Sequence, residues 1–218
     1  MHEIRLDVFD VLPDYADENS IVTLAGKDIS AVPSDFKGLV DIGESDAEIP
    51  FRKIRSVHDF EKTPSEEALR EIMQHGNQEL SKCACRVNTF SDLHVIHKVA
   101  TSTEREHLIL GLGELGTVTR SRQGILGRKT AEGQLSAAEM NELGDDCKLV
   151  GIIGHPLGHS MSPQMQGAAM RDKGIKGLYL KFDSPDLGNV DDVIREYDIT
   201  GMNVTIPYKQ DIIPHLDS

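Results

Sequence analysis

The sequence contains no tryptophan, and only 5% of its 218 residues are aromatic. Its three cysteines, Cys83, Cys85 and Cys147, have neither the even number of a disulfide framework nor the spacing of zinc-binding pairs. No run approaches the roughly 18 apolar residues of a membrane span, and the first residues lack the basic-then-apolar order of a signal peptide. We therefore expect neither a secreted disulfide scaffold nor a membrane protein, and the cytoplasm is the expected location.

Positive charge is also scarce. The chain has 23 Lys and Arg against 36 Asp and Glu, which gives a formal net charge of −13. An acidic surface repels nucleic acid and anionic lipid, so we expect neither as a partner. A small anionic substrate would need a local cluster of Lys or Arg.

Short apolar runs alternate with polar helical segments, which is typical of parallel α/β units. In the first half, strands are predicted at residues 4–9, 20–24, 39–42, 54–57, 82–87 and 108–110, and helices at 64–75 and 90–100. Thr63 is the expected N-cap of the first helix, with Pro64 at its first position. In the second half, strands are predicted at residues 149–153, 177–182 and 201–206, and helices at 162–172 and 187–197. A polar stretch with a predicted helix at 136–143 separates the halves, so we divide the chain into residues 1–146 and 147–218.

Charged and apolar side chains alternate in residues 3–7 (EIRLD). The period of two along a strand places Glu3, Arg5 and Asp7 on one face. The strand is either a solvated edge or the wall of a polar site, because a parallel sheet buries both of its faces.

Two further residues occupy positions suited to catalysis. His58 lies at the C-terminal end of a predicted strand, where α/β folds carry their chemistry, and an ordinary histidine pKa suits proton abstraction near neutral pH. Lys82 begins a strand beside Cys83 and Ala84, an apolar setting in which desolvation favours the free amine that attacks a ketone. For each residue taken alone, a structural histidine and a surface lysine remain the alternatives.

Residues 111–116 (GLGELG) match the pattern G-x-G-x-x-G of dinucleotide-binding sites and follow a predicted strand. The residues after them, TVTRSR, favour no helix, whereas a nucleotide-binding unit needs a helix there. An unrelated dinucleotide-binding protein is therefore the least favoured function. The absence of a helix after Gly116 would remove it.

In their order along the chain, these features resemble type I 3-dehydroquinate dehydratases. The resemblance is carried by residues 3–7, 56–60 (SVHDF), Lys82, 113–120 (GELGTVTR) and 131–134 (AEGQ). It implies an α/β fold, namely an incomplete (β/α)₈ TIM-barrel-like domain that lacks its first βα unit. Ala25 stands in the place of a substrate-binding Arg of the family, and Thr119 in the place of its usual Ser.

The resemblance implies the dehydration of 3-dehydroquinate to 3-dehydroshikimate without a metal. Lys82 would form an imine with the ketone, and His58 would take the acidified proton and later help water to leave. Arg120 would pair with the substrate carboxylate, for which a bidentate guanidinium is apt. The other implied substrate contacts, to hydroxyl groups, come from Glu3, Arg5 and Gln134.

The second half carries two longer motifs. Residues 150–163 (VGIIGHPLGHSMSP) read as a strand, a Gly-rich turn and a helix start, with Ser162 as the N-cap. Such a helix start can bind a small polyol or carboxylate through hydroxyls and free N–H groups. Residues 203–209 (NVTIPYK) read as a strand that presents Lys209 just beyond its end. Simple capping and a surface cation are the alternatives for Ser162 and Lys209.

Both motifs closely resemble the substrate-binding domain of shikimate dehydrogenase, which would occupy residues 147–218. The resemblance implies that Ser160 and Ser162 hold the substrate carboxylate, that Asn203 and Thr205 contact the ring, and that Lys209 is catalytic. These side chains should share one cleft at the carboxyl ends of a parallel βαβαβ layer. NADP(H) would serve the complete dehydrogenase, whose nucleotide domain would lie past Ser218, and this chain would bind no cofactor and no metal.

We therefore expect a shikimate-pathway enzyme that joins a dehydratase to the start of a dehydrogenase. Its expected partners are small molecules, 3-dehydroquinate and 3-dehydroshikimate or shikimate, and a homodimer is left open. The main alternative is a degenerate, non-catalytic remnant that still binds a small acid.

Overall fold

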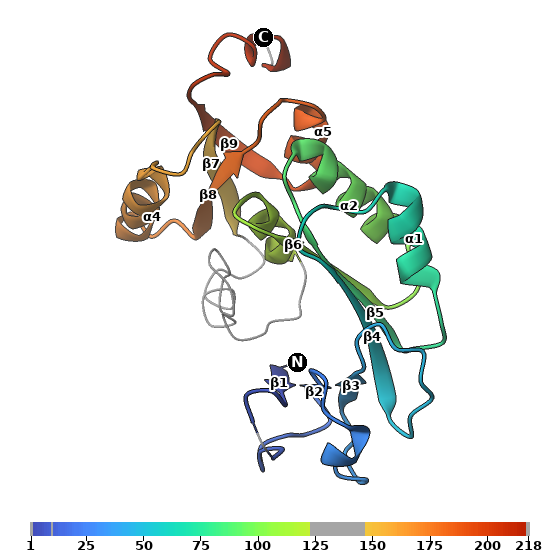
Figure 1. Ribbon diagram of the computed structural model, residues 1–218. Coiled ribbons are helices and arrows are strands. Elements are labelled where there is room, and N and C mark those ends of the chain that lie inside the picture. The colour runs from blue at the N-terminus through green and yellow to red at the C-terminus, as the bar shows by residue number, and fades with distance from the viewer. Residues whose placement is uncertain (1, 10, 123–146, 217–218) are drawn as a thin grey trace.

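The computed structural model describes residues 2–9, 11–122 and 147–216, which fold into two parallel sheets (Figure 1). Six strands pair in chain order and curl into a half barrel, which confirms the expected TIM-barrel-like α/β fold. These strands are β1 (His2–Arg5), β2 (Ser20–Thr23), β3 (Leu39–Asp41), β4 (Arg52–Asp59), β5 (Leu80–Arg86) and β6 (His107–Leu112). The first predicted strand is too long at its C-terminal end, because the chain turns after Arg5.

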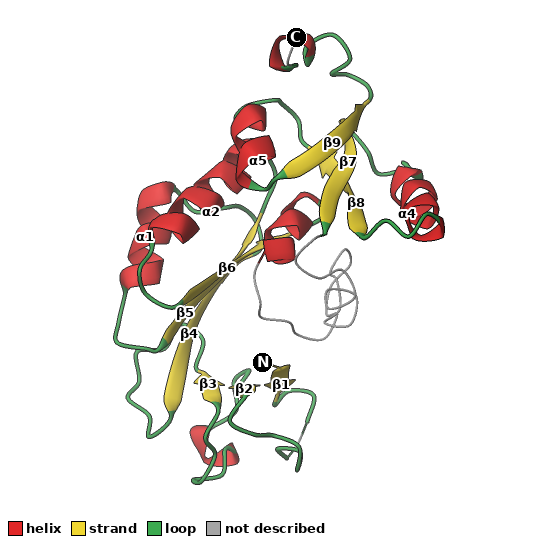
Figure 2. Ribbon diagram, turned by 180° about the vertical axis from the view of Figure 1, so that it is seen from behind, coloured by secondary structure: helices red, strands yellow, loops and turns green. Residues whose placement is uncertain are grey.

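Two helices cover one face of the β4–β6 part of this sheet (Figure 2). They are α1 (Glu66–Gln74) and α2 (Phe90–Ser102). Among the described residues, the connections between β1 and β4 contain only the short 3₁₀ helix η1 (Ile29–Ala31). Leu69 and Met73 of α1 pack against Cys83 and Cys85 of β5. The period of two then turns Lys82 and Ala84 toward the opposite, concave face.

The start of α1 differs from the prediction. Ser65, not Thr63, is the N-cap, and its side chain accepts the N–H of Ala68. The Thr63 hydroxyl instead donates to the carbonyl of Arg86 at 2.8 Å, which ties the start of α1 to the end of β5. Pro64 therefore lies outside the helix.

The second sheet has the order β8-β7-β9, and all its strands are parallel. Its elements are β7 (Lys148–Gly154), α4 (Ser162–Asp172), β8 (Gly177–Asp183), α5 (Val190–Glu196), β9 (Ile199–Val204) and the 3₁₀ helix η3 (Ile213–His215). The predicted βαβαβ layer is thus confirmed. Ser162 is the first residue of α4 rather than its N-cap, and Met161 precedes it without a side-chain capping bond.

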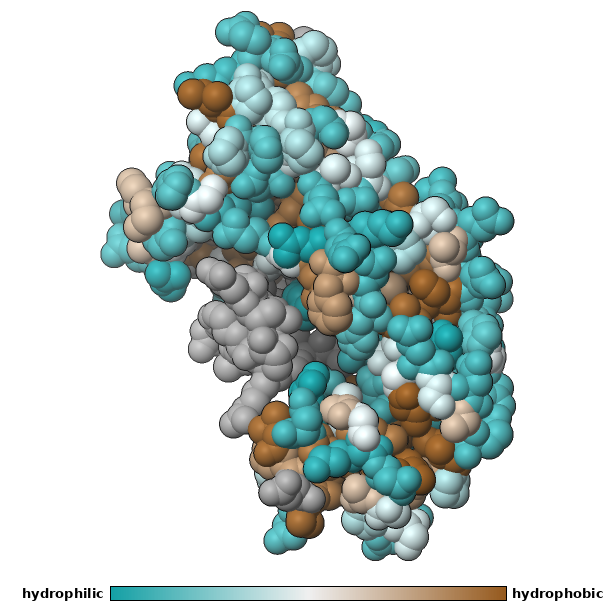
Figure 3. Space-filling view, viewed as in Figure 1, coloured by the Kyte–Doolittle hydropathy of each residue, from teal (hydrophilic) through white to brown (hydrophobic). Residues whose placement is uncertain are grey.

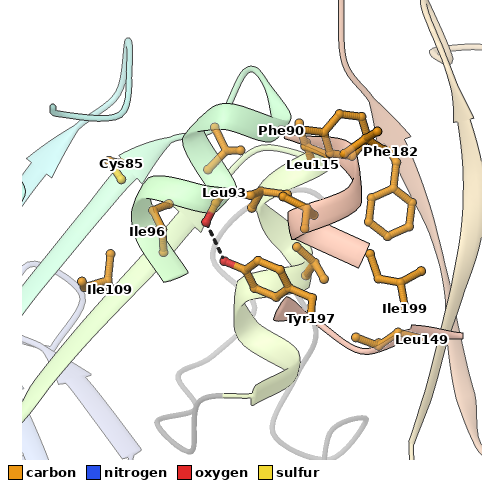
Figure 4. Packing of buried hydrophobic residues seen from close by; sticks show 14 of the residues in the cluster. Cys85, Phe90, Leu93, Ile96, Ile109, Leu115, Leu149, Phe182, Tyr197 and Ile199 are labelled. Atoms are coloured by element: carbon orange, nitrogen blue, oxygen red, sulfur yellow. Dashed lines mark hydrogen bonds between the residues drawn. The ribbon is translucent and has the colours of Figure 1, made fainter. Parts of the chain in front are cut away.

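The two sheets share one hydrophobic core, which lies where α2 meets α5 and β8 (Figure 4). The rings of Phe90 and Phe182 stack with centroids 6.4 Å apart, and the hydroxyl of the buried Tyr197 donates to the carbonyl of Leu93. His94 of α2 adds a 2.7 Å contact to Glu196 of α5. The predicted boundary at residue 146 and the predicted helix at 136–143 lie outside the described residues.

The surface seen in Figure 3 is mostly hydrophilic, with apolar patches that include the β1–β3 end of the chain. Among the described residues, no helix is both long and apolar enough to cross a membrane. The same residues contain no cluster of side chains that could hold a metal ion.

Candidate active sites

The concave face of the half barrel carries a polar cluster built from consecutive strands. Register along the sheet places Glu3 of β1 beside β2, Asp41 at the end of β3, and Ser56 of β4 opposite Lys82 of β5. Apolar residues on the same face form a layer toward the amino ends of the strands, namely Ile21, Leu39, Ile54 and Leu80. The charges therefore lie toward the carboxyl ends, as in other (β/α) sites.

Lys82 is the centre of this cluster. Its ammonium lies 3.4 Å from Asp41 Oδ2 and 3.7 Å from Glu3 Oε1, and its side chain is only 14% exposed. The predicted apolar setting is therefore wrong for this side chain, because Cys83 and Cys85 point to the other face of the strand. The two carboxylates compensate the charge of this largely covered ammonium and fix its position within the sheet.

The carboxylates are themselves held by neighbouring hydroxyls. Asp41 is 1% exposed, and its Oδ1 accepts the Ser56 hydroxyl at 2.6 Å and the N–H of Gly43 at 3.0 Å. Glu3 accepts the Thr23 hydroxyl at 2.5 Å. Sequence reasoning missed Asp41, Ser56 and Thr23. Asp41 could have been found, because an acidic residue at the carboxyl end of a short apolar strand is a signal of a polar site.

His58 extends from the same face of β4, two residues beyond Ser56. Its pKa is lowered from the ordinary 6.5, first by partial desolvation and then by the Lys82 ammonium, while Asp41 and Glu3 oppose the shift. The ring stacks on the exposed Phe60, with centroids 5.9 Å apart. A lowered pKa keeps this imidazole neutral, and so able to accept a proton, at neutral pH.

Arg5 lies at the edge of the cluster and pairs with Asp7 in two hydrogen bonds of 2.8 and 3.1 Å. This pair raises the pKa of Arg5 and lowers that of Asp7. The guanidinium is therefore partly engaged. Gln134, a predicted contact, lies outside the described residues.

The glycine-rich turn after β6 leads into a 3₁₀ helix, η2 (Leu115–Arg122). The expectation of no helix after Gly116 is thus wrong, but this helix is not the α-helix of a nucleotide-binding unit. A Cβ on Gly111 would lie 2.7 Å from the Cα of Gly116, so the glycines allow the chain to pass against itself. Thr119 closes the turn, since its hydroxyl accepts the N–H of Gly111 and donates to the carbonyl of Gly116, both at 2.8 Å.

Arg120 lies in η2, which follows β6, the strand that pairs with the β5 strand of Lys82. Burial lowers the pKa of its guanidinium. Within the described residues the guanidinium has no acidic partner, which leaves it available to an anion.

In the second sheet, the two motifs meet at the carboxyl edge. Thr205 donates its N–H to the carbonyl of Ile153, and His155 donates its N–H to that of Ile206, at 2.9 and 3.0 Å. A Cβ on Gly154 would lie 2.5 Å from the Thr205 methyl, so glycine permits this approach. The loop that carries Ser160 and the segment that carries Lys209 therefore leave the sheet at the same edge.

Tyr179 of β8 connects two of the predicted site residues. Its hydroxyl donates to Asn203 Oδ1 at 2.6 Å and also bonds the side chain of Ser162. Burial raises the Tyr179 pKa, and the Ser162 bond opposes that shift. Sequence reasoning missed Tyr179, because nothing in its own strand marks it.

Ser160 and Lys209 are held less firmly. Ser160 Oγ accepts the N–H of Ser162 at 3.4 Å, whereas Lys209 is exposed and makes no ion pair within the described part of the chain. The shared cleft of Ser160, Ser162, Thr205 and Lys209 stays a prediction, supported by the common edge.

Comparison with known proteins identifies both parts. Residues 38–145 match the family model of type I 3-dehydroquinase, and residues 152–218 match the shikimate dehydrogenase substrate binding domain. Shikimate dehydrogenase (NADP(+)) of Halothermothrix orenii is 47% identical over 72 residues, and that of Methanococcus maripaludis is 49% identical over 72. Each match covers 32% of this chain, which spans about a quarter of the length of these relatives.

Two solved structures are similar at lower identity. The dehydroquinate dehydratase and shikimate dehydrogenase from S. pombe AroM is 19% identical, with a TM-score of 0.47, over 99% of this chain and 53% of that one. The type I dehydratase from Clostridium difficile is 19% identical, with a TM-score of 0.46, over 56% of this chain and 66% of that one. The assignment rests on the family models and on the closer sequence identities. This polypeptide joins a type I 3-dehydroquinase segment to a shikimate dehydrogenase substrate-binding segment.

Proposed function

We propose that the first segment dehydrates 3-dehydroquinate through an imine on Lys82, and that the second binds 3-dehydroshikimate or shikimate. The observation that carries the proposal is the placement of the Lys82 ammonium beside the carboxylates of Glu3 and Asp41, with His58 on the same face of the adjacent strand, β4. A lysine, a histidine and ordered acids are the groups that imine-based dehydration needs.

The first step is addition of the Lys82 amine to the substrate ketone. The ammonium must first lose a proton, which one of the neighbouring carboxylates, 3.4 and 3.7 Å away, or His58 on the adjacent strand would accept. The nitrogen then bonds to the carbonyl carbon, whose oxygen leaves as water. The resulting iminium cation would keep the favourable contact with Glu3 and Asp41 that the ammonium makes.

His58 serves the second step. The iminium acidifies the adjacent C–H, and the neutral imidazole accepts that proton. The enamine so formed expels the β-hydroxyl, which leaves as water with the proton from the imidazolium. Hydrolysis of the conjugated iminium then releases the product and restores Lys82.

Arg120 is proposed to hold the substrate carboxylate, because its guanidinium is partly buried and lacks an acid partner among the described residues. Glu3, Arg5 and Gln134 are proposed to contact hydroxyl groups. Asp41 is proposed to position Lys82, because its carboxylate contacts the ammonium through Oδ2 and is held in place by the Ser56 hydroxyl, which donates to Oδ1.

In the second segment, Ser160 and Ser162 would hold a carboxylate, Asn203 and Thr205 the ring hydroxyls, and Lys209 would assist proton transfer. The matched relatives are named for NADP(+), which supplies the hydride acceptor or donor in a whole dehydrogenase. We propose that this chain itself binds no NADP(H), because the turn at Gly111–Gly116 packs on itself.

Borohydride trapping tests the dehydratase proposal. Reduction in the presence of 3-dehydroquinate should add the mass of the ligand to the peptide that contains Lys82. A Lys82→Ala variant should not be labelled, whereas a matched Lys53→Ala variant, which removes a similarly covered lysine of β4, should be labelled normally. Labelling of Lys82→Ala would refute the assignment.

A further inference from the structure

Two charged residues on one face of β8 hold the loop between β7 and α4. Asp183 accepts the N–H of Leu157 at 2.8 Å and contacts His155 Nδ1 at 2.7 Å. Lys181, two residues earlier and so on the same face, donates to the carbonyl of Gly158 at 3.3 Å. The loop that presents Ser160 and Ser162 is therefore fixed from the side by a strand that carries neither motif.

Lys181 also reaches the other segment. Its ammonium lies 3.2 Å from Glu114 Oε1, in the turn between β6 and η2 that leads to Arg120. The Lys181 side chain is 11% exposed and that of Glu114 is 49% exposed. One ammonium thus joins the turn of the dehydroquinase segment to the substrate loop of the dehydrogenase segment.

The burial of Lys181 makes the two contacts interdependent. A covered ammonium needs compensation by an anion, and a carbonyl alone is a weaker partner than a carboxylate. When Glu114 loses its charge, the ammonium gains by turning toward water, and the contact to Gly158 weakens with it.

We propose that Lys181 is a positioning residue that orders residues 155–161, and that Glu114 of the first segment controls this order. The part that concerns a ligand rests on the function proposed for the second segment. Glu114 lies within residues 113–120, which carry the resemblance to the dehydratases, whereas Lys181 lies outside both dehydrogenase motifs. Neither residue has a role in either proposed reaction.

Hydrogen exchange in the full chain tests the ordering without any ligand. Glu114→Gln and Lys181→Met should each speed exchange of the loop amides at 157–161 by roughly three- to tenfold. The double variant should exchange no faster than Lys181→Met, and Lys181→Arg should restore protection. The control is Glu79→Gln, which neutralises an acid of matched exposure, 50%, that pairs with Arg52 within the first sheet; it should leave the loop unchanged.

Shikimate titration tests the consequence for binding. The affinity of the Glu114→Gln variant for shikimate should fall by the same factor as the exchange protection of its loop amides. The affinity of the Glu79→Gln variant for shikimate should not change. If the unaltered chain fails to bind shikimate, the function proposed for the second segment fails, while the exchange data still decide the role of Lys181. Unchanged loop exchange in Glu114→Gln, or effects of the two substitutions that simply add, would overturn the inference. Glu114→Gln is a surface change, so it decides even if Lys181→Met does not fold.

Discussion

The two candidate sites differ in how their polar groups are held. In the half barrel, Lys82, Glu3 and Asp41 project from strands and satisfy one another directly. In the second sheet, Ser160 and Lys209 lie on turns beyond the strands, and Ser162 begins α4. The loop that carries Ser160 and Ser162 is supported by Tyr179, Lys181 and Asp183 of β8. A site on strands is ordered by backbone pairing, whereas a site on loops is ordered only as well as its side-chain supports allow.

The largest effect is expected when the hydrophobic core that both segments share is disrupted. Phe182→Ala deletes a buried ring that stacks on Phe90 across the two segments, and should lower the free energy of unfolding by about 3–5 kcal/mol. Urea denaturation measures this loss. An exposed side chain, Met165, gives the control, and Met165→Ala should have little effect. A small effect of Phe182→Ala would show that the segments do not depend on a common core.

The half-barrel site should be the more sensitive to loss of one charge. Asp41→Asn leaves Lys82 with one carboxylate and disturbs the bond to Ser56, and should cost about 1–3 kcal/mol of unfolding free energy. The exposed Asp7→Asn should cost much less, because water solvates the freed Arg5. Equal losses for the two variants would contradict the description of Asp41 as a buried positioning acid.

The loop site should respond to a side chain outside its motifs. Tyr179→Phe removes the hydroxyl that bonds Asn203 and Ser162, and should weaken shikimate binding by about 0.5–1.5 kcal/mol in calorimetric titration. Borohydride labelling of Lys82 should be unaffected in the same variant. A loss of labelling would mean that the two sites are not separable in this way.

The smallest effect concerns the titration of His58. Lys82→Met removes a cation that lowers the His58 pKa, so this pKa should rise; Asp41→Asn removes an anion that raises it, so it should fall further. Because the folded-state pKa lies below 6.5, the unfolded chain binds more protons near that pH, and stability rises with pH through this window. NMR titration measures the direction of both His58 pKa shifts, and the His58→Gln variant assigns the resonance. Shifts in the opposite directions would place His58 outside the charge cluster.

Much of this arrangement could be predicted from the sequence. The bounds of α4 match the prediction, and most strands do so within a few residues, because Pro, Gly and apolar runs mark them locally. The supporting residues Asp41 and Tyr179 could not be placed, since their partners are distant in the chain and are set by sheet register. The start of α1 could not be predicted either, because Ser65 and Thr63 are chemically similar N-cap residues. The end of β5 decides between them, since its Arg86 carbonyl accepts the Thr63 hydroxyl and leaves Ser65 to cap the helix.

The core that α2, α5 and β8 form together has a consequence for how the chain can be divided. Two fragments, residues 1–122 and 147–218, would each expose an apolar surface that the other covers in the intact chain. Such surfaces, with the Tyr197–Leu93 and His94–Glu196 bonds to set their register, are the basis of fragment complementation. We expect the separately purified halves to reassemble when mixed, and each alone to aggregate more readily than the pair.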